Sequence, residues 1–581
     1  MTRISPEKPE AEDKRPAPFE RFVREEDGVI TIFTIFMLFM VLMVCGIAVD
    51  LMRNEMERIK VQNTLDRAIL AAADLQQTLD PNVVVTDYFE KAGIAEYLGD
   101  ITVTPGDNLP TNYFRTVEAS ARARTPSPYM AMTGVNDLPL FVAGTAEEVV
   151  SNLEISLVLD VSGSMGRNSR LVNLKVAAKD FVDQIANNSQ DGRMAISIVP
   201  YATQVSIPDA MADRLTLEGT NPHSNCLNFA ASDFLTPAMR VPSAAAGAPP
   251  VVAYERTMHF DPWTYRSSLD DGDGRLSTPH ELVKSPVCEA DANREILPLQ
   301  KDRDVLKNYI EALDAAGNTS IDVGMKWGLA MLDSSMSPMV EGLISDGTVS
   351  AQFSGRPADY NSDENLKVIV LMTDGENTAQ YYIEDGYREG QTVLWWNADA
   401  SVYSVYDDIT EEFYYSRAVD TDGDADVDGD DERWGVSPYG CLNPTNSSDS
   451  SDWDCSAGTP AGGAYNISFP DLWAHTPILE NFYTNFYPWM NYSTAANRWY
   501  YNAFDNVSSG TKNTRTENIC DEAKDEGVIV FTIGFEAPEN GQAVLRNCAS
   551  SVSHYFDVDG LEIADAFNAI AHEITQLRLT H

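Results

Sequence analysis

The sequence predicts an α/β protein whose main domain contains an open, mostly parallel sheet. Short apolar runs alternate with amphipathic helical segments from residue 153 onward, and two of the apolar runs end abruptly in an acidic residue. Strands that alternate with helices are typical of parallel sheets that are wound in two directions. The strands are expected at 153–160, 194–199, 368–373, 528–533 and 555–557, and the helices at 171–185, 304–313, 323–332, 518–526, 543–548 and 562–577.

Two long insertions interrupt this pattern, at about residues 206–298 and 376–513. A core of this kind needs about 200 residues, within the usual range of domain sizes, whereas the region 151–581 is far longer. Both insertions exceed ordinary connections of about 4–6 residues. Because long loops on a rigid scaffold often carry specificity, we expect the second insertion to stand over any site at Asp374, which it follows directly.

Oxygen-bearing side chains cluster where the first strand ends. The run LVLDVSGSMG at 157–166 places Asp160, Ser162 and Ser164 on one tight turn. Mg²⁺ prefers oxygen ligands and needs only one or two carboxylates, and an open α/β sheet has its ligand sites at the carboxyl ends of its strands. The alternative is that the acid is an ordinary strand-end residue and the serines are turn residues.

Two further fragments follow in order, GNTSID at 317–322 and KVIVLMTDG at 367–375. Together with the first turn they resemble the von Willebrand factor A (vWA) domain and its metal-ion-dependent adhesion site. The resemblance implies a Mg²⁺ ion (or Mn²⁺ or Ca²⁺) with one coordination position left for a carboxylate from a protein partner. Carried over position by position, the ligands would be Asp160, Ser162, Ser164, Thr319 and Asp374.

The N-terminal region predicts a membrane anchor. Residues 28–49 form a stretch of 22 positions without a charged side chain, and about 20 apolar residues span the hydrocarbon core as a helix. A cleaved signal peptide is the alternative, although its apolar region is usually about 7–15 residues long. Residues 1–27 are rich in proline and charge and are expected to form a disordered cytoplasmic tail.

Residues 50–150 are expected to form a helix followed by a small α+β stalk. An apolar stripe at helical spacing runs through 51–79. Short β-rich runs at 82–85, 100–103 and 115–121 then alternate with proline and glycine turns.

Both ends of the chain resemble TadG-like proteins of Flp (Tad) pilus assembly. The resemblance implies a bacterial cytoplasmic (inner) membrane protein with one span, its N-terminus inside and its vWA domain in the periplasm or outside the cell. Its partners would be other pilus-assembly components. The similar segments are REEDG at 24–28, IKVQNTLDRAILAAADL at 59–75, GVIVFTIGF at 527–535, LRNCAS at 545–550, HYF at 554–556 and the terminal helix up to 580.

The cysteines favour an oxidising compartment. Cys45 lies in the apolar span, and an even number, six, lies beyond it. Six free thiols in a cytosolic domain are the alternative. Sequence proximity favours the pairs Cys226–Cys288, Cys441–Cys455 and Cys520–Cys548.

Two acidic stretches resemble calcium-binding loops. DTDGDADVDGDD at 420–431 has the spacing of an EF-hand loop, although Ala425 replaces the turn glycine and Asp431 the usual glutamate. A weaker version surrounds DDGDGRLS at 270–277, and a solvated acidic run is the alternative for both. The candidate Ca²⁺ ligands are Asp420, Asp422, Asp424, Asp426, Asp428 and Asp431 in the first, and Asp271, Asp273, Ser277 and Glu281 in the second.

The second insertion also holds seven of the nine tryptophans, at 395, 396, 434, 453, 473, 489 and 499. Such aromatic residues could form an adhesive face that binds carbohydrate or attaches the protein to a surface. The interpretation we favour is that they supply the core of a small extra subdomain.

The composition and the absence of certain motifs argue against several classes of function. The 88 acidic and 41 basic residues give a net charge of −47, which repels phosphate backbones and argues against nucleic acid. The sequence has no phosphate-binding loop or nucleophile elbow, and its seven histidines lack zinc-ligand spacing. We therefore expect a non-enzymatic, membrane-anchored protein that binds or adheres through a divalent cation. The alternatives are a structural envelope protein whose metal ions act as staples, or a surface adhesin that uses the aromatic, acidic insertion.

Overall fold

The computed structural model describes residues 27–74, 79–105, 114–149, 152–189, 191–242, 250–264, 282–289, 291–361, 365–397, 400, 402–419, 432–441 and 463–580. The chain divides into two compact units, Met1–Val150 and Ser151–His581. Helices and sheets occur in both units, so the protein is of the mixed α/β class.

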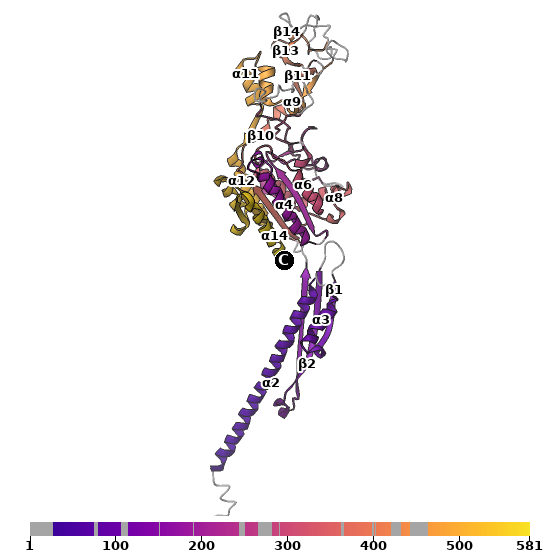
Figure 1. Ribbon diagram of the computed structural model, residues 1–581, viewed down its shortest axis with the longest axis vertical. Helices are drawn as coiled ribbons and strands as arrows, with labels where there is room; N and C mark the ends of the chain where they lie inside the picture. The colour runs from indigo at the N-terminus through magenta and orange to yellow at the C-terminus, as the bar shows by residue number, and fades with distance from the viewer. Residues whose placement is uncertain are drawn as a thin grey trace, which may run out of the picture. The chain divides into compact units, whose positions relative to one another are not determined.

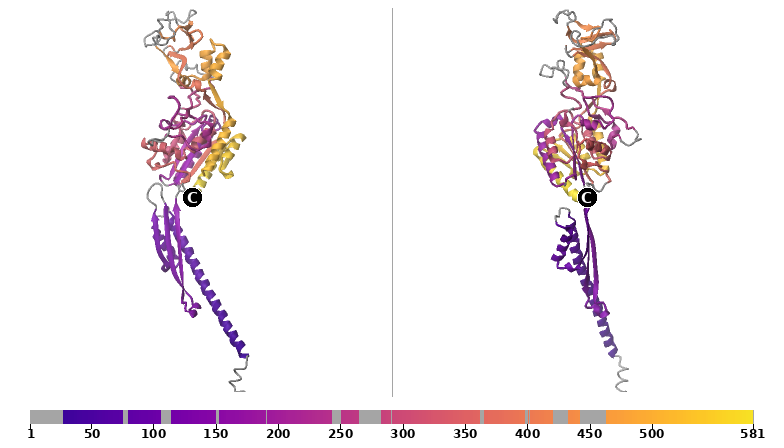
Figure 2. Two further views of the ribbon diagram at one scale, coloured as in Figure 1. Left: turned by 180° about the vertical axis from the view of Figure 1, so that it is seen from behind. Right: turned by 90° about the vertical axis from the view of Figure 1, so that its right-hand side faces the viewer.

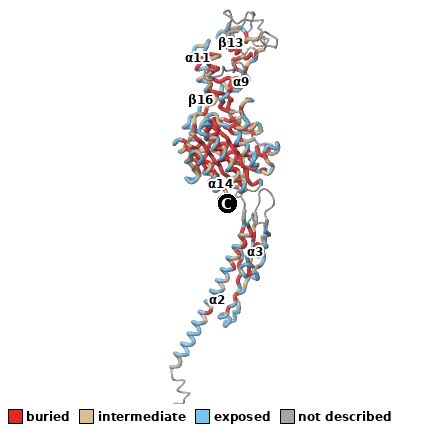
Figure 3. The backbone as a smooth tube through the Cα atoms, viewed as in Figure 1, coloured by how far each residue is buried: buried red, intermediate tan, exposed pale blue. Residues whose placement is uncertain are grey.

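In the first unit a long helix packs against an antiparallel sheet of three strands in the order β1-β2-β3. Helix α2 (Asp27–Ala73) exposes large apolar side chains in its first half and buries Val61, Leu65 and Ile69 in its second, a contrast that Figure 3 makes visible. From Ile30 onward it is long and apolar enough to cross a membrane, which fits an anchor or a signal sequence. The other elements are α3 (Pro81–Lys91), η1 (Ala95–Tyr97), β1 (Leu98–Pro105), β2 (Phe114–Pro126), η2 (Met130–Thr133) and β3 (Asp137–Val149).

The predicted strand at 82–85 is wrong, because these residues lie in helix α3. The side chain of Asp80 accepts a hydrogen bond from the Asn82 amide at 2.8 Å, and Pro81 occupies the first turn. An N-cap acid followed by proline begins a helix whatever the β-propensity of the valines that come next. The runs at 100–103 and 115–121 do lie in β1 and β2.

Six strands form the main sheet of the second unit, in the spatial order β18-β17-β9-β4-β5-β8. The sheet packs against helix α4 (Arg170–Asn187), which is labelled in Figure 1. Four neighbouring pairs are parallel, and β5 and β8 are antiparallel. Every residue of β4 and β5 is buried, which is why both are mostly apolar rather than alternating. The strands are β4 (Asn152–Asp160), β5 (Met194–Tyr201), β8 (Leu297–Gln300), β9 (Asn365–Thr373), β17 (Ile529–Phe535) and β18 (Tyr555–Val558).

Helices cover both faces of this sheet (Figure 2). Leu157 of β4 belongs to a core shared with α4, α6 and α14, whereas its neighbour Val158 belongs to a core shared with α7, α8, α12 and α13. Alternate residues of one strand thus fill two cores. These helices and the short turns are η3 (Gly163–Gly166), α4 (Arg170–Asn187), α6 (Arg303–Ala312), α7 (Ile321–Ala330), η7 (Ser334–Met336), α8 (Ser337–Ser345), η8 (Ala351–Phe353), α12 (Ser509–Asp525), α13 (Glu539–Cys548), η13 (Val552–His554), η14 (Gly560–Glu562) and α14 (Ile563–Thr580).

The second insertion builds its own sheet of five strands, in the order β14-β13-β12-β11-β15. It leaves and rejoins the main domain through the antiparallel pair β10 and β16. Its elements are β10 (Gln380–Ile383), η9 (Asp385–Tyr387), β11 (Gln391–Asn397), β12 (Val402–Asp407), β13 (Glu412–Val419), β14 (Glu432–Gly435), β15 (Ala464–Ser468), α9 (Phe469–His475), α10 (Ile478–Asn481), η11 (Phe482–Phe486), α11 (Tyr492–Ala496), η12 (Asn497–Tyr501) and β16 (Phe504–Val507).

The two insertions share one hydrophobic core. Met258, Phe260 and Val287 of the first insertion pack with Trp396, Trp473 and other residues of the second. The Val283 amide donates to the Ala474 carbonyl at 2.8 Å, and the Ile478 amide donates to the Asp261 carbonyl at 3.0 Å. The first insertion contributes α5 (Asp209–Ala212), β6 (Leu227–Asn228), η4 (Ala231–Leu235), β7 (Glu255–Arg256) and η6 (Ala292–Arg294).

Lys326 of α7 fastens the first insertion to the main domain. Its side chain is fully buried, and Nζ donates to the carbonyls of Thr236, Pro237 and Ala238 at 2.8, 3.1 and 3.0 Å. Burial lowers the pKa of Lys326 to about 8, in spite of the nearby Asp233 and Asp333 carboxylates. The folded protein therefore holds this proton less tightly than the unfolded chain does.

This buried lysine predicts a rise of stability with pH. Between about pH 8 and 10 the unfolded chain binds more protons at this residue, so the free energy of unfolding increases with pH. Lys326→Met removes this contribution, on the order of 2 kcal/mol across the window. Calorimetric melting of the full chain in detergent at pH 8, 9 and 10 measures it. Lys307→Met, which removes a partly exposed lysine of α6, is the control and keeps the slope. An unchanged slope in Lys326→Met would contradict the assignment.

Candidate metal site

The candidate site lies at the carboxyl edge of β4 and β9. These strands are adjacent and parallel, with Leu159 opposite Met372, so Asp160 at the end of β4 comes level with the start of the turn that carries Asp374. From β4 the chain continues to β5 and β8 on one side, and from β9 to β17 and β18 on the other. The site therefore lies where the strand order reverses, which is where open α/β sheets bind ligands.

Asp160 is completely buried. Its Oδ1 accepts a hydrogen bond from the Ser162 amide at 2.8 Å, and its Oδ2 accepts one from the Thr373 hydroxyl at 2.6 Å. Burial and the nearby Asp374 carboxylate raise the pKa of Asp160 to about 7, although the hydrogen bonds from Thr373 and Ser162 oppose the rise. The carboxylate form thus lacks compensating positive charge, which a bound cation would supply.

Ser162, Ser164 and Asp374 continue this hydrogen-bonded network. The Oγ atoms of Ser162 and Ser164 are 3.0 Å apart, and the Ser164 hydroxyl donates to Oδ1 of Asp374 at 2.7 Å. Ser162 and Asp374 are buried, and Ser164 is half-buried. Four of the five predicted ligands are therefore brought together by direct hydrogen bonds.

Thr319 reaches the same edge from the loop before α7. The Gly163 amide donates to the Gly317 carbonyl at 2.9 Å, which joins this loop to the serine turn. A Cβ built on Gly375, the residue after Asp374, would lie 3.7 Å from Oγ1 of Thr319. The loop turns at Gly317, whose φ of +80° favours glycine. The fifth predicted ligand thus lies beside the segment that carries the fourth.

A fully buried lysine, Lys512 of α12, holds the Thr319 loop. Its Nζ donates to the carbonyls of Thr319 and Thr378 at 2.9 and 2.8 Å and to the Ser320 hydroxyl at 2.5 Å. Thr378 belongs to the start of the second insertion, and Lys512 lies at its end. Both stems of the insertion therefore meet at the loop that carries Thr319.

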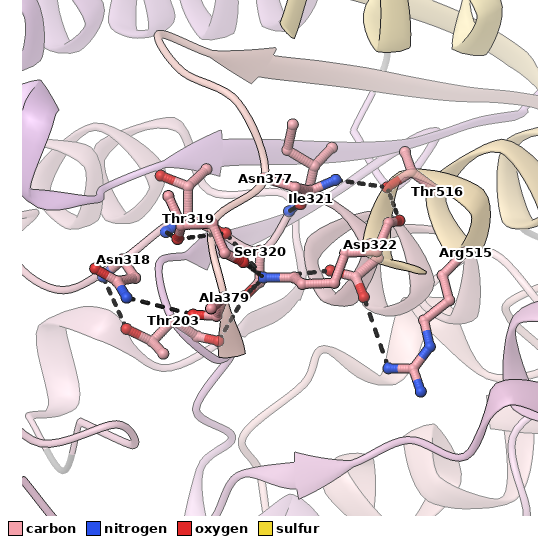
Figure 4. A network of polar contacts seen from close by, with 12 residues as sticks. Thr203, Asn318, Thr319, Ser320, Ile321, Asp322, Asn377, Ala379, Arg515 and Thr516 are labelled. Atoms are coloured by element: carbon pink, nitrogen blue, oxygen red, sulfur yellow. Dashed lines mark hydrogen bonds and ion pairs between the residues drawn. The ribbon is translucent and has the colours of Figure 1, made fainter. Parts of the chain in front are cut away.

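The buried carboxylate of Asp322 balances this lysine. Lys512 Nζ lies 3.8 Å from its Oδ1, and Arg515 Nη1 lies 4.0 Å from its Oδ2. Asn377 adds a second link, because its Oδ1 accepts from the Ile321 amide at 2.8 Å and its Nδ2 donates to Thr516 Oγ1 at 3.2 Å (Figure 4). The start of α7 is thus fixed from both stems.

Arg170, the first residue of α4, is a second charged group beside the predicted ligands. Its Nη1 donates to Oδ2 of Asp374 at 2.7 Å, and its Nε donates to Oε2 of Glu536 at 2.8 Å. Sequence reasoning missed Arg170, Glu536 and Lys512. Arg170 follows the serine turn closely, but nothing in the sequence distinguishes it from a surface arginine, and Lys512 lies in a largely polar helix.

The donor set suits a hard divalent cation. Among the described residues no group of three or more histidine, cysteine, aspartate or glutamate side chains could hold a metal ion. The site at β4 and β9 instead offers two carboxylates and three hydroxyls, and Mg²⁺ accepts one or two carboxylates with further oxygen ligands and retained water. Asp160 is buried and lacks compensating positive charge. The residues of this site therefore fit such an ion.

The candidate calcium ligands lie outside the described residues: Asp420, Asp422, Asp424, Asp426, Asp428 and Asp431 of the first loop, and Asp271, Asp273, Ser277 and Glu281 of the second.

Disulfides join cysteines of the second unit. The structure contains Cys226–Cys288 and Cys520–Cys548, two of the pairs that sequence proximity favours. Cys441 is disulfide-bonded, but its expected partner Cys455 lies outside the described residues. Cys45 is a free thiol.

The Lys512–Asp322 pair yields a stability prediction. Lys512→Met leaves Asp322 buried with one distant cation, and breaking a buried pair in this way costs about 3–5 kcal/mol. Asp322→Asn in the same chain removes the stranded charge and is expected to recover a large part of this loss. Chemical unfolding of the two single variants and the double variant measures the coupling. Strictly additive effects would contradict the pairing.

The N-terminal segment is similar to a known family. Residues 28–75 match the family model described as Flp pilus-assembly TadE/G-like. The match covers the apolar helix α2 and relates this part of the chain to pilus assembly. No curated protein sequence matches the chain.

Similar solved structures include pilus proteins. The vWF domain of the type V pili tip protein Mfa5 from Porphyromonas gingivalis is 14% identical, with 74% of this chain and 97% of that chain covered at a TM-score of 0.29. The pilus adhesin SpaC from Lactobacillus rhamnosus GG is 11% identical, with 82% and 33% covered at 0.27. The adhesive tip pilin GBS104 from Group B Streptococcus agalactiae is 14% identical, with 73% and 100% covered at 0.27. These TM-scores are too low to establish a common fold.

Proposed function

We propose that the chain is a membrane-anchored, non-enzymatic protein of a Tad/Flp pilus-assembly system, and that its second unit is a vWA-type domain with a metal-ion-dependent adhesion site. One observation carries the proposal: two carboxylates and three hydroxyls, from segments more than 200 residues apart in sequence, meet at the switch point of a mostly parallel sheet. The buried Asp160 among them lacks a compensating cation.

Asp160, Ser162, Ser164, Thr319 and Asp374 would hold a Mg²⁺ ion, or Mn²⁺ or Ca²⁺ in its place. The bound ion supplies positive charge and a coordination position for an acidic side chain of a protein partner. The residues of the chain orient the oxygens: Thr373 and the Ser162 amide fix the carboxylate of Asp160, and Lys512 fixes the loop of Thr319. Because the carboxylates are shielded from water, charge contributes strongly to the contact.

Three features support the proposed location in a bacterial inner membrane, with the vWA domain in the periplasm or outside the cell. Helix α2 is long and apolar enough to span a membrane. The same segment matches the TadE/G-like model, and pilus-assembly components are therefore the proposed partners. The disulfides of the second unit fit an oxidising compartment.

The aromatic insertion is better explained as a folded subdomain than as a binding surface. Trp396, Trp473 and Trp499 are buried in the core that the two insertions share. Tyr465, Tyr487, Tyr492 and Tyr501 are exposed, but the rings of Tyr487 and Tyr492 pack against Phe482 of the same core. We therefore assign the adhesive role to the metal site, with the insertions contributing partner selectivity.

The metal site predicts cation-dependent stability. Mn²⁺ at 100 times its dissociation constant is expected to stabilise the full chain by about 2.7 kcal/mol, and EDTA should reverse the effect. In Asp160→Asn the carboxylate charge is lost, so the part of the stabilisation that comes from this site should disappear. The difference between the two proteins isolates this site from any ion bound at the acidic loops.

Asp525→Asn is the matched control, because it removes the same charge from an exposed position of α12. Capture of pilus-assembly components from a detergent extract of the envelope, in Mg²⁺ and in EDTA, separates adhesion from a structural role. Equal capture in both buffers, despite cation-dependent melting, would mean that the ion is only a staple. Equal Mn²⁺ stabilisation of the wild type and Asp160→Asn would contradict the site itself.

A further inference from the structure

Arg170 neutralises one of the two carboxylates of the proposed metal site. Its side chain is 16% exposed, and that of Asp374 is fully buried. Both oxygens of Asp374 are engaged, Oδ1 by the Ser164 hydroxyl and Oδ2 by the guanidinium. A charge-assisted hydrogen bond of 2.7 Å to a buried carboxylate is among the stronger polar contacts of a protein. Asp374 is therefore not a free anion.

The charge balance of the site follows from this contact. Asp160 and Asp374 contribute two negative charges and Arg170 one positive charge, so the three side chains sum to −1. A dication then leaves one net positive charge at the edge of the sheet. Without Arg170 the same ion would be fully neutralised by the two carboxylates, and a partner carboxylate would gain much less from approaching it.

Glu536 holds the arginine from the other side. It accepts from Nε at 2.8 Å and is 25% exposed, so its charge is better screened by water than that of Asp374. The contact fixes the guanidinium against the loop after β17 and keeps it directed at Asp374. Glu536 is thus an orienting partner of Arg170 that lies outside the predicted ligand set.

We propose that Arg170 determines the specificity of the metal site for acidic partners: it weakens binding of the cation alone and leaves the cation-loaded site positively charged, so that a carboxylate completes it. This inference rests on the proposed function. A strut that only joins α4 to the loops after β9 and β17 is the competing role. The two roles predict opposite effects of losing Arg170 on cation affinity. Loss of a strut would loosen the site and weaken cation binding, whereas loss of the positive charge would make the site more negative and strengthen cation binding.

The test uses Mn²⁺ and the full chain in detergent. Arg170→Gln is expected to bind Mn²⁺ about tenfold more tightly, because a unit positive charge close to the ion has been removed. Arg170→Lys keeps the charge and should stay within about twofold of the wild type. Electron paramagnetic resonance counts bound and free Mn²⁺, and melting in EDTA verifies that each variant is folded.

Acetate labelled with ¹³C is the carboxylate probe, detected by its magnetic coupling to the bound Mn²⁺. The wild type should take up acetate at about tenfold lower concentration than Arg170→Gln. Glu536→Gln removes the negative charge that holds Arg170 from this side and so weakens the strut, but the guanidinium charge stays beside Asp374. This variant should bind Mn²⁺ as the wild type does or slightly more weakly. Opposite shifts of Mn²⁺ and acetate affinity in Arg170→Gln are a signature that a loosened site cannot produce.

The outcomes separate the inference from the function on which it rests. Mn²⁺ binding that Asp160→Asn abolishes, combined with unchanged or weaker binding in Arg170→Gln, would overturn the role of Arg170 alone. The same would follow if Glu536→Gln and Arg170→Gln shifted Mn²⁺ affinity in the same direction by the same amount. Absence of any Mn²⁺ binding that depends on Asp160 would overturn the proposed function, and the inference with it.

Discussion

The burial of two carboxylates side by side is the constraint on which the site depends. The parallel register of β4 and β9 brings Asp160 and Asp374 to the same edge of the sheet, and the surrounding core excludes water from both. Like charges in such a position repel one another and resist ionisation, as the raised pKa of Asp160 reflects. The neighbouring hydroxyls, the Ser162 amide and Arg170 offset this only in part. The cation that we propose for this site would supply the positive charge that is still missing.

The two insertions are attached to the elements that surround the site. Each is fastened near α7 by a fully buried lysine, Lys326 for the first and Lys512 for the second, and the two insertions then share one core. Lys512 donates a hydrogen bond to the carbonyl of Thr319 itself. The second insertion and the Thr319 loop therefore cannot move independently without breaking a buried hydrogen bond. The parts of the chain that vary most from a minimal α/β domain are thus attached to the residues that would hold the ion.

The sequence predicted the five parallel strands of the main sheet because the relevant signals are local, whereas the antiparallel edge strand β8, at the end of the expected first insertion, was missed. Buried parallel strands are apolar runs, and the acids that end two of them, Asp160 and Asp374, mark the carboxyl edge. The order of strands placed Asp160, Ser162, Ser164 and Asp374 at that edge, where the structure has them hydrogen-bonded. A local signal also explains the error at 82–85, since Asp80 and Pro81 set the start of α3 more strongly than the valines favour a strand.

The charged groups around the site could not be predicted, because their meaning depends on distant partners. Arg170 meets Asp374 and Glu536 across 204 and 366 positions of sequence, and Lys512 meets Thr319 across 193. An arginine at a helix start or a lysine in a polar helix normally faces solvent. The sharing of one core by the two insertions was missed for the same reason, because the sequence predicted a core for the second insertion alone and the residues that the first contributes lie far away in the chain.

Anomalous diffraction from crystals of the protein soaked in Mn²⁺ tests the central claim most directly. The account predicts one peak among the oxygens of Asp160, Ser162, Ser164, Thr319 and Asp374, removed by Asp160→Asn and with Arg170 retained beside Asp374. A structure in which Mn²⁺ fully occupies other sites of the protein but gives no peak at the ends of β4 and β9 would contradict it.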